Sequence, residues 1–415
     1  MLDLQGFMKR RKGHAFPMNA LPFQLRKKKI SQSIWMTIFL VACFGAGIGW
    51  LNKRIKRLEH KNKTLGISLK TLERETSVLS STKKVPISSR LASLPFGEET
   101  GIVLRVQEVN IRGVPAAYNP SLVKSAFGYD LFFRYDVVNP KLHYAPFSSQ
   151  IGVVPLDSHF KQDKQEFKKI ELQNEYTDDP RVLFVGNQLY LFYNKLNEIN
   201  PKCRSMCVSQ LDPQLYNVNY MTTLDLNLQW IEKNWSPFEY IGEDLQSRLF
   251  FEYKINPRKI LELPNPQINE MKNITIPTQS AYLNLTWENK WGEIRGGTPA
   301  SKIGDEYLGF FHSQFTDEKG LIWYVMGAYT FDARPPFHLT KISKYPILFN
   351  GIYESPLIHT APVGKRVIFP AGFVIEKQDE RDLIHLACGE NDCNVKIITI
   401  QKEQLIKSME KINAE

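Results

Sequence analysis

Hydrophobic and polar positions follow a different pattern in each of three parts of the chain. The first pattern is Ile34–Leu51, IWMTIFLVACFGAGIGWL, which contains no charged residue. An uncharged run of this length is close to the ~20 residues that cross a bilayer as a helix. We therefore expect a transmembrane signal anchor at 34–51, preceded by a basic cytoplasmic tail at 1–33.

One feature of this segment leaves an alternative open. Leu40-Val41-Ala42-Cys43 is similar to a bacterial lipoprotein cleavage box, although the chain stays apolar beyond Cys43. A cleaved signal peptide fits less well than an anchor, because more than 30 residues precede the apolar run.

A second pattern follows the expected anchor, where apolar residues alternate in the 4-3 spacing of a coiled coil. The seam positions are Leu51, Ile55, Leu58, Asn62, Leu65, Leu69, Leu72, Thr76 and Leu79. The spacing predicts a short coiled-coil stem at 52–80, and Asn62 at a core position favours a parallel homodimer. A single amphipathic stem helix is the alternative.

The third pattern begins near residue 95, after a linker at 81–94. Short aromatic and β-branched runs are separated by Gly, Asn, Asp and Pro, which is typical of strands and turns. One apolar segment recurs as DLFFRYD, QLYLFYN, RLFFEYK, YLGFFHS and DLIHLAC, with leucines at 131, 189, 249, 308 and 383.

The steps between these leucines are 58, 60, 59 and 75 residues. A near-constant period of this size predicts an all-β fold, a five-bladed β-propeller of four-stranded blades, over 95–402. Strands of a β-sandwich would not recur in this way. The longer last step predicts an insertion around Pro335–Tyr353, and residues 403–415 are left as a C-terminal tail.

Charge is distributed unevenly between these parts. The net charge is +10, and 14 basic residues lie within the first 63 positions, on both sides of the apolar run. The expected propeller is therefore close to neutral, which argues against a nucleic-acid partner. The slight basic excess before the anchor places the N-terminus in the cytoplasm and the propeller on the extracytoplasmic side.

Four cysteines lie within the expected propeller, as the pairs Cys203/Cys207 and Cys388/Cys393. Each pair is close enough in sequence to close a small disulfide loop in an oxidising compartment. Neither spacing is that of a zinc site, and we expect no metal and no cofactor.

Polar residues recur at nearly the same interval as the apolar segments. Asn119 lies in AAYNPS, Asp179 in TDDPR, Lys233 in EKNWSPF and Arg295 in IRGGTPA. Equivalent positions of successive blades surround one central channel. The sequence therefore predicts a polar ligand site where these four side chains converge.

These motifs resemble glycoside hydrolase family 130, five-bladed propellers that act on β-mannosides as phosphorylases or hydrolases. TDDPR before a hairpin resembles the family's EDPR motif, with Asp178 in place of the usual Glu. AAYNPS with Arg134, EKNWSPF, RGGTPA with Phe311-His312, and FPAGF with GENDCNV resemble its motifs in blades one, three, four and five. The resemblance spans Asn119 to Val395 and extends to the related β-1,2-mannosyltransferases.

The resemblance implies roles for individual residues. Asp179 would be the general acid, which requires a pKa raised by burial or by a neighbouring carboxylate. Asp178 would be structural, because adjacent side chains point to opposite faces of a strand. The expected substrate-binding residues are Asn119, Arg134, Arg181, Lys233, Arg295, His312 and Asp392, with the cations holding phosphate and Asn119 and Asp392 binding sugar hydroxyls.

Two further expectations concern the surroundings of Asp179. Glu252 is a possible second carboxylate, which an inverting hydrolase needs in order to activate water. Trp235 and Tyr253 are candidates for an apolar platform under a sugar face.

The sequence thus favours a membrane-anchored, glycan-active enzyme that cleaves or forms β-mannosidic bonds. Its expected partners are a mannoside and inorganic phosphate or a sugar phosphate, with phosphate, water or another glycan as the acceptor. The alternative is a nonenzymatic propeller that binds a glycan or a protein at the cell surface. A metal-dependent nucleotide-sugar transferase is disfavoured, because the region contains no Asp-x-Asp signature.

Overall fold

The computed structural model describes residues 86–114, 116–138, 147–163, 165–173, 176–196, 203–224, 229–263, 275–355 and 364–412. The expected anchor at 34–51 and stem at 52–80 lie outside these ranges. Within the described part of the chain, no helix has the length and apolarity that a membrane span requires.

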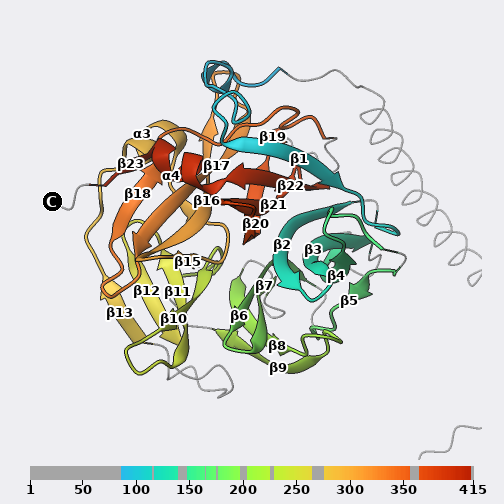
Figure 1. Ribbon diagram of the computed structural model, residues 1–415. Helices are drawn as coiled ribbons and strands as arrows, with labels where there is room; N and C mark the ends of the chain where they lie inside the picture. The colour runs from blue at the N-terminus through green and yellow to red at the C-terminus, as the bar shows by residue number, and fades with distance from the viewer. Residues whose placement is uncertain are drawn as a thin grey trace, which may run out of the picture. The chain divides into compact units, whose positions relative to one another are not determined.

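Five separate β-sheets follow one another around a common centre in chain order (Figure 1). The first sheet contains β2 (Ala117–Ser125), β3 (Gly128–Val138), β4 (Phe147–Leu156) and β5 (Lys168–Lys169). The second contains β6 (Thr177–Val185), β7 (Gln188–Leu196), β8 (Arg204–Leu211) and β9 (Val218–Leu224). The third contains β10 (Ser236–Ile241), β11 (Ser247–Lys254), β12 (Lys259–Leu263) and β13 (Thr275–Gln279).

The fourth sheet is larger than its neighbours and has seven strands. They are β14 (Arg295–Gly296), β15 (Ser301–Ile303), β16 (Glu306–Thr316), β17 (Ile322–Asp332), β18 (Leu339–Ser343), β19 (Lys365–Arg366) and β23 (Met409–Lys411). The fifth sheet has the spatial order β1 (Val103–Val109), β22 (Asn394–Gln401), β21 (Arg381–Glu390) and β20 (Ile368–Gln378).

The predicted all-β propeller is confirmed, with one departure from regular blades. Four sheets have the predicted four strands. In the fourth, the strand before β16 is divided into β14 and β15, which both pair with β16, and β19 and the C-terminal β23 are added at the margins. Three short helices complete the described structure: α2 (Ser89–Ala92), α3 (Thr286–Trp291) and α4 (Lys402–Ser408). The segment 403–415, expected as a tail, therefore carries most of α4 and all of β23.

The five recurring apolar segments form the second strand of each sheet, namely β3, β7, β11, β16 and β21. Each of these strands is hydrogen-bonded on both sides, and its two faces pack against neighbouring sheets. A strand in this position has no solvent-facing side, so its sequence is a continuous apolar run instead of an alternating one. This explains why the 60-residue period is so clear in the sequence.

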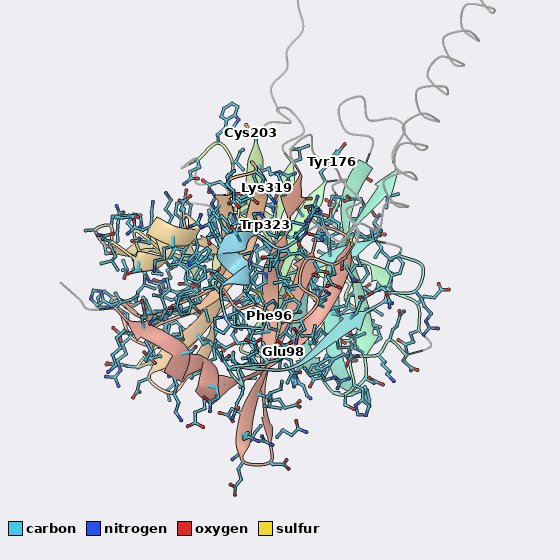
Figure 2. The ribbon with its side chains drawn as sticks, turned by 90° about the horizontal axis from the view of Figure 1, so that it is seen from above. Phe96, Glu98, Tyr176, Cys203, Lys319 and Trp323 are labelled. Carbon is cyan, nitrogen blue, oxygen red and sulfur yellow. The ribbon has the colours of Figure 1, made fainter. Side chains whose placement is uncertain are left out.

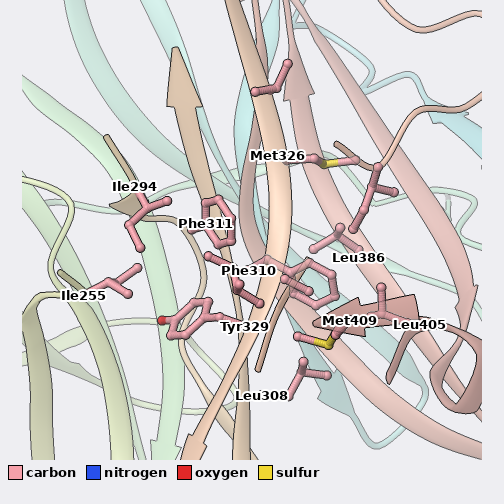
Figure 3. Close-up of a cluster of buried hydrophobic side chains, with 14 of the residues drawn as sticks. Ile255, Ile294, Leu308, Phe310, Phe311, Met326, Tyr329, Leu386, Leu405 and Met409 are labelled. Carbon is pink, nitrogen blue, oxygen red and sulfur yellow. The ribbon is translucent and has the colours of Figure 1, made fainter. Parts of the chain in front are cut away.

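The chain closes its own ring, because the N-terminal β1 pairs with β22 from Val103↔Ile400 to Val109↔Val395 (Figure 1). The largest apolar cluster lies where the third, fourth and fifth sheets meet, around Phe310, Phe311, Met326, Tyr329 and Leu386 (Figure 3). Near the centre, the inner strands β2, β6 and β20 pack against one another. The central side chains are thus held by a rigid frame.

Candidate active site

Two inner strands carry the same local irregularity at the centre of the ring. The register of β2 against β3 shifts between Tyr118 and Ser121, and that of β6 against β7 shifts between Asp178 and Arg181. The residues at these bulges are Asn119-Pro120 and Asp179-Pro180. Proline is tolerated there because a bulge residue gives no hydrogen bond to the ladder, and Asn119 and Asp179 have positive φ angles of 47° and 54°.

The two bulges bring Asn119 and Asp179 into contact. Asn119 Nδ2 donates to Asp179 Oδ1 at 2.8 Å. The same oxygen lies 3.5 Å from Nη1 of Arg134, whose strand is the second of the first sheet. Three of the predicted site residues, from two sheets, therefore form one cluster.

Asp178 belongs to this cluster as well, contrary to the expectation from strand alternation. Its Oδ1 lies 3.2 Å from Nη2 of Arg134, and its Oδ2 pairs with Nη1 of Arg204. The bulge at Asp179 breaks the alternation, so both carboxylates reach the same guanidinium. Arg204, which also donates to Asn194 Oδ1 at 2.6 Å, is a site residue that the sequence analysis missed.

The protonation state of Asp179 differs from the expectation. Burial raises the pKa of its carboxyl, but the cations of Arg134 and Arg181 and the hydrogen bond from Asn119 outweigh burial. The net result is a pKa below the ordinary value of an aspartate. The predicted rise is therefore wrong for the ligand-free protein, where Asp179 is a carboxylate at neutral pH.

Arg181 takes a different place from the other cations. It is fully buried, and it donates through Nε to Gly297 O at 2.5 Å and through Nη2 to Gly296 O at 3.1 Å. These bonds tie the second sheet to the fourth across the centre. Burial lowers the pKa of Arg181 to about 10, so the group stays charged and adds to the positive field at Asp179.

Lys233, Arg295 and His312 approach the same centre from the third and fourth sheets. Burial lowers the pKa of Lys233, whose ammonium interacts electrostatically with Asp179, Arg204 and Arg295. Arg295 and His312 are register partners of β14 and β16. Burial, Arg181 and Arg295 together lower the pKa of His312 to about 3, so its imidazole is neutral at physiological pH.

The last predicted residue, Asp392, lies in the turn between β21 and β22 and interacts with Tyr118 and Tyr324. These two tyrosines are further site residues that the sequence analysis missed. Tyr118 lies under the Arg134 guanidinium at 4.8 Å, and Tyr324 is stacked with His312 at a centroid distance of 6.1 Å. Tyr118 directly precedes Asn119 in AAYNPS, a signal that could have pointed to it, whereas Tyr324 lies in none of the motifs.

Glu252 is separated from this cluster by its own partners. The side chain is fully buried, forms an ion pair with Arg258 and accepts a hydrogen bond from the hydroxyl of Tyr329. Burial raises the pKa of Glu252 despite the adjacent guanidinium. Neither of these contacts joins it to Asp179, so the expected pair of carboxylates is not seen among the described residues.

The two aromatic residues of the expected sugar platform border a pocket but expose little of their surface. Trp235 and Tyr253 are only 1% and 8% exposed, so they offer little surface to a ligand. Their polar atoms instead donate to one carboxylate, Glu232, at 3.1 Å from Trp235 Nε1 and 3.3 Å from the Tyr253 hydroxyl. The aromatic pair is therefore part of the framework of the third sheet.

A pocket of about 290 Å³ opens beside the cluster, between the third and fourth sheets. Lys233, Asn234 and Arg295 line it together with Glu232 and Glu293. In Figure 2, Tyr176, directly before β6, and Cys203, directly before β8, lie toward the same side of the molecule. Asp179 and Arg204 follow these two residues closely in sequence.

The described cysteines Cys203, Cys207, Cys388 and Cys393 are all free thiols, so the two possible disulfide loops are not formed. Among the described residues, no group of three or more His, Cys, Asp or Glu side chains is arranged as a metal site.

A ring of sheets with a carboxylate, several cations and amide donors at its centre is the arrangement of a propeller enzyme that acts on polar substrates. The chain belongs to glycoside hydrolase family 130, because the family model described as beta-1,4-mannooligosaccharide phosphorylase matches residues 81–411. It is thus an enzyme of the glycoside phosphorylase and hydrolase type. No curated protein matches the sequence.

Several solved structures are similar in fold. A mannose phosphorylase from Leishmania mexicana, in complex with phosphate ion, is 15% identical with a TM-score of 0.49, over 76% of this chain and 94% of that one. A beta-1,2-mannobiose phosphorylase from Listeria innocua is 14% identical with a TM-score of 0.49, over 75% and 98%. A GDP-Man-dependent mannosyltransferase from Leishmania mexicana is 12% identical with a TM-score of 0.45, over 74% and 91%. Likeness at this level does not carry an activity from one chain to another.

Proposed function

We propose that this enzyme is a phosphorylase that cleaves a β-mannosidic bond with inorganic phosphate, with Asp179 as the proton donor. The family model supports a mannoside substrate. The observation that carries the choice of phosphate is the ring of cations around Asp179. Arg134, Arg204 and Arg295 lie on strands of the first, second and fourth sheets, Lys233 lies just before the third, and all act electrostatically on Asp179 or on one another.

Charge distinguishes phosphorolysis from hydrolysis at this site. An inverting hydrolase needs a second carboxylate, ~6.5–9.5 Å from the acid, that activates water. Glu252, the candidate for that role, is engaged by Arg258 and Tyr329. Phosphate is itself the nucleophile and needs cations that hold its charge, which guanidinium and ammonium groups supply.

In the proposed reaction, a phosphate oxygen attacks the anomeric carbon of the mannosyl unit and forms the new C–O bond. The glycosidic C–O bond breaks, and the leaving oxygen takes the proton from Asp179, either directly or through a sugar hydroxyl. The products are mannose 1-phosphate and a shortened glycan, and Asp179 is left as a carboxylate. A single displacement of this kind inverts the anomeric centre.

The remaining residues orient the sugar in this proposal. Asn119 and Asp392 bind hydroxyl groups of the mannosyl unit from the first and fifth sheets. His312 is neutral, and its Nδ1 is buried without a hydrogen-bond partner among the described residues. Such an atom is suited to a hydroxyl group of the substrate, because a buried polar atom left unpaired is costly.

The test uses the full-length protein with a panel of β-1,4- and β-1,2-linked manno-oligosaccharides, each with and without inorganic phosphate. We expect mannose 1-phosphate to be released only in the presence of phosphate. Free mannose formed equally in both arms would contradict phosphorolysis and establish hydrolysis. Transfer only from a sugar nucleotide would establish the transferase instead, and binding without turnover would favour the nonenzymatic propeller.

We further propose that residues 34–51 anchor the enzyme in a membrane as a single-pass protein, with the propeller on the extracytoplasmic side. The support is the uncharged apolar run and its basic flanks. Full-length protein should resist alkaline extraction from membranes, and deletion of residues 1–51 should release it. Cross-linking through the stem at 52–80 would test the parallel homodimer in the same preparation.

A further inference from the structure

The geometry around Asp179 poses a problem for the proposed reaction, on which this inference rests. Both groups that contact Asp179 Oδ1 are donors, the amide of Asn119 at 2.8 Å and the guanidinium of Arg134 at 3.5 Å. Contacts with donors alone suit a carboxylate, which only accepts hydrogen bonds. A proton donor, however, must carry a proton before the glycosidic bond breaks.

We infer that binding of an oxyanion among the cations of the site loads Asp179 with its proton, so that anion binding and proton uptake are one coupled event. The anion is inorganic phosphate in the proposed reaction. The free enzyme then holds the acid in its inactive, charged form. The co-substrate converts it to the active form.

The charged groups that face Asp179 come from every sheet. The cations are Arg134 on β3, Arg181 on β6, Arg204 on β8, Lys233 before β10 and Arg295 on β14. The carboxylates are Asp136 and Asp178 beside Arg134, Glu293 beside Arg295, and Asp392 near Tyr118 and Tyr324. Glu232 and Lys254 line the adjacent pocket and add one charge of each sign. A bound dianion would add negative charge beside Asp179, and like charge disfavours the ionised form of an acid.

Protonation of Asp179 leaves Arg134 and Arg204 paired with another carboxylate, while the buried Arg181 keeps its hydrogen bonds to the carbonyls of Gly296 and Gly297. Arg134 keeps Asp178 at 3.2 Å, and Asp178 keeps Arg204 as a second partner. Breaking a buried ion pair is costly when it leaves an unpaired charge, and this arrangement avoids that cost. Asp179 is therefore the member of the network that can become neutral.

Asn119 fits the protonated acid as well as the carboxylate. Its Oδ1 is buried and has no hydrogen-bond partner in the described part of the chain. An amide carries donors on one side and an acceptor on the other. Rotation of the amide by half a turn would present Oδ1 to a new O–H on Asp179, which satisfies both groups.

Linkage turns this coupling into a measurable pH dependence. If the anion-bound form holds one more proton than the free form, affinity for the anion rises as the pH falls. At pH values above the pKa of Asp179 in the anion complex, the coupling disappears, because Asp179 is then ionised in both the free and the anion-bound protein. Binding to lysines alone has the same sign but a different pH window, because ordinary lysines lose their charge only near their pKa of ~10.4.

The experiment uses inorganic sulfate as the first probe, because sulfate remains a dianion across the pH range in which phosphate itself gains a proton. Calorimetric titrations of the full-length protein are run at one mildly acidic pH, in buffers of different ionisation enthalpy. The slope of observed enthalpy against buffer enthalpy gives the protons taken up per anion. We expect an uptake that approaches one proton for the wild type, and a similar dependence for phosphate after correction for its own titration.

Three variants identify the group that takes the proton. Asp179→Asn is expected to bind sulfate with no proton uptake, and its folding is checked by melting temperature. His312→Gln and Asp392→Asn remove two of the other groups able to accept a proton at the site, and both are expected to retain the uptake. An infrared difference spectrum should show a protonated carboxyl band on sulfate binding in the wild type, absent in Asp179→Asn.

The outcomes separate this inference from the proposed function. Sulfate and phosphate binding without proton uptake would overturn the inference and leave phosphorolysis standing. Uptake that persists in Asp179→Asn and vanishes in His312→Gln would also overturn it, and would place the proton on the imidazole. Absence of any anion binding would remove the proposed phosphorolysis, and the inference with it.

Discussion

Arg134 and Glu252 occupy equivalent positions in the first and third sheets but have different roles. Tyr118 pairs with Arg134 in the first sheet, Asp178 with Asn194 in the second, and Ser236 with Glu252 in the third. In each case the first member lies on the inner strand and the second on its neighbour. The repeat thus brings a cation, an amide and a carboxylate to equivalent points around one centre.

Their partners decide what each residue does. The Arg134 side chain is 21% exposed and lies against two aspartates at the centre. The Glu252 side chain is 0% exposed, and its partners Arg258 and Tyr329 belong to the third and fourth sheets. A symmetric fold therefore does not imply symmetric roles: one position serves the site, and its equivalent holds two blades together.

The largest effect is expected where the site loses its acid. Asp179→Asn should lower kcat/KM by ~10²–10⁴, the usual contribution of a general acid. The melting temperature should change little, because Arg134 retains Asp178. Mannose 1-phosphate release and thermal unfolding are measured on the same preparation. Wild-type turnover in this variant would remove Asp179 from the mechanism.

The structural role of Glu252 in holding two sheets together is tested by Glu252→Gln. Removing one member of a buried ion pair costs about 3–5 kcal/mol, since it leaves the Arg258 charge buried and unpaired. Denaturant unfolding measures the loss. The matched control is Asp244→Asn, which breaks the exposed Asp244–Arg248 pair and should cost no more than ~1 kcal/mol. Equal losses in the two variants would contradict the role assigned to Glu252.

Arg134→Gln is the counterpart of that variant at the equivalent position. We expect kcat/KM to fall by ~10²–10³, comparable to the loss of one preorganised donor in an active site. The free energy of unfolding should fall by less than in Glu252→Gln. The reverse order, with Arg134 costing stability and Glu252 costing turnover, would invert the comparison.

Arg204→Gln should have a smaller effect, because Arg204 is one of several cations of the proposed phosphate site and is itself paired with Asp178. A loss of about tenfold in kcat/KM, equal to ~1.4 kcal/mol, is expected. The change should be seen mainly in KM for phosphate, and Arg204→Lys should restore part of it. A purely structural role would instead lower kcat and melting temperature together, without rescue.

The smallest effect concerns stability against pH. The pKa of Asp179 is held low by Arg134, Arg181 and Asn119 in the folded protein, so its charge stabilises the fold above its ordinary pKa of ~3.9. That contribution is lost as the pH falls through the lower, folded value. The difference in unfolding free energy between wild type and Asp179→Asn should therefore narrow below about pH 4. A difference that widens on acidification would contradict the low pKa.

The repeat made the architecture predictable, since strands buried on both faces leave a continuous apolar run such as DLFFRYD. The bulges were not predictable, because no periodicity marks a residue with positive φ such as Asp179. Without the bulge, alternation wrongly separates Asp178 from Asp179. The direction of the Asp179 pKa was not predictable either. Arg134 and Arg181 were expected at the site, but whether their charges outweigh burial depends on distances that only the fold determines.

Site residues that lie outside the motifs could not be identified from the sequence. Arg204 begins β8, whose other residues are mostly core residues. Its partner Asp178 lies on β6, so the β6–β7 hairpin separates the two residues in the sequence. The small exposed surface of Trp235 and Tyr253 was not predictable, because exposure of an aromatic side chain cannot be judged from its neighbours in sequence. Their burial around Glu232 becomes apparent only from the packing of the third sheet.

The pairing of β1 with β22 has a consequence for how the chain reaches this structure. The fifth sheet is complete only when Val103 pairs with Ile400, which follows it by roughly 300 residues in the chain. Closing so long a loop is slow, because its entropy is lost before the contact is gained. During synthesis β1 therefore emerges long before its partner, as an unpaired strand that is prone to misassembly. We expect ring closure to be the last step of folding, and chaperones that shield β1 to have their largest effect on this protein while it is still being made.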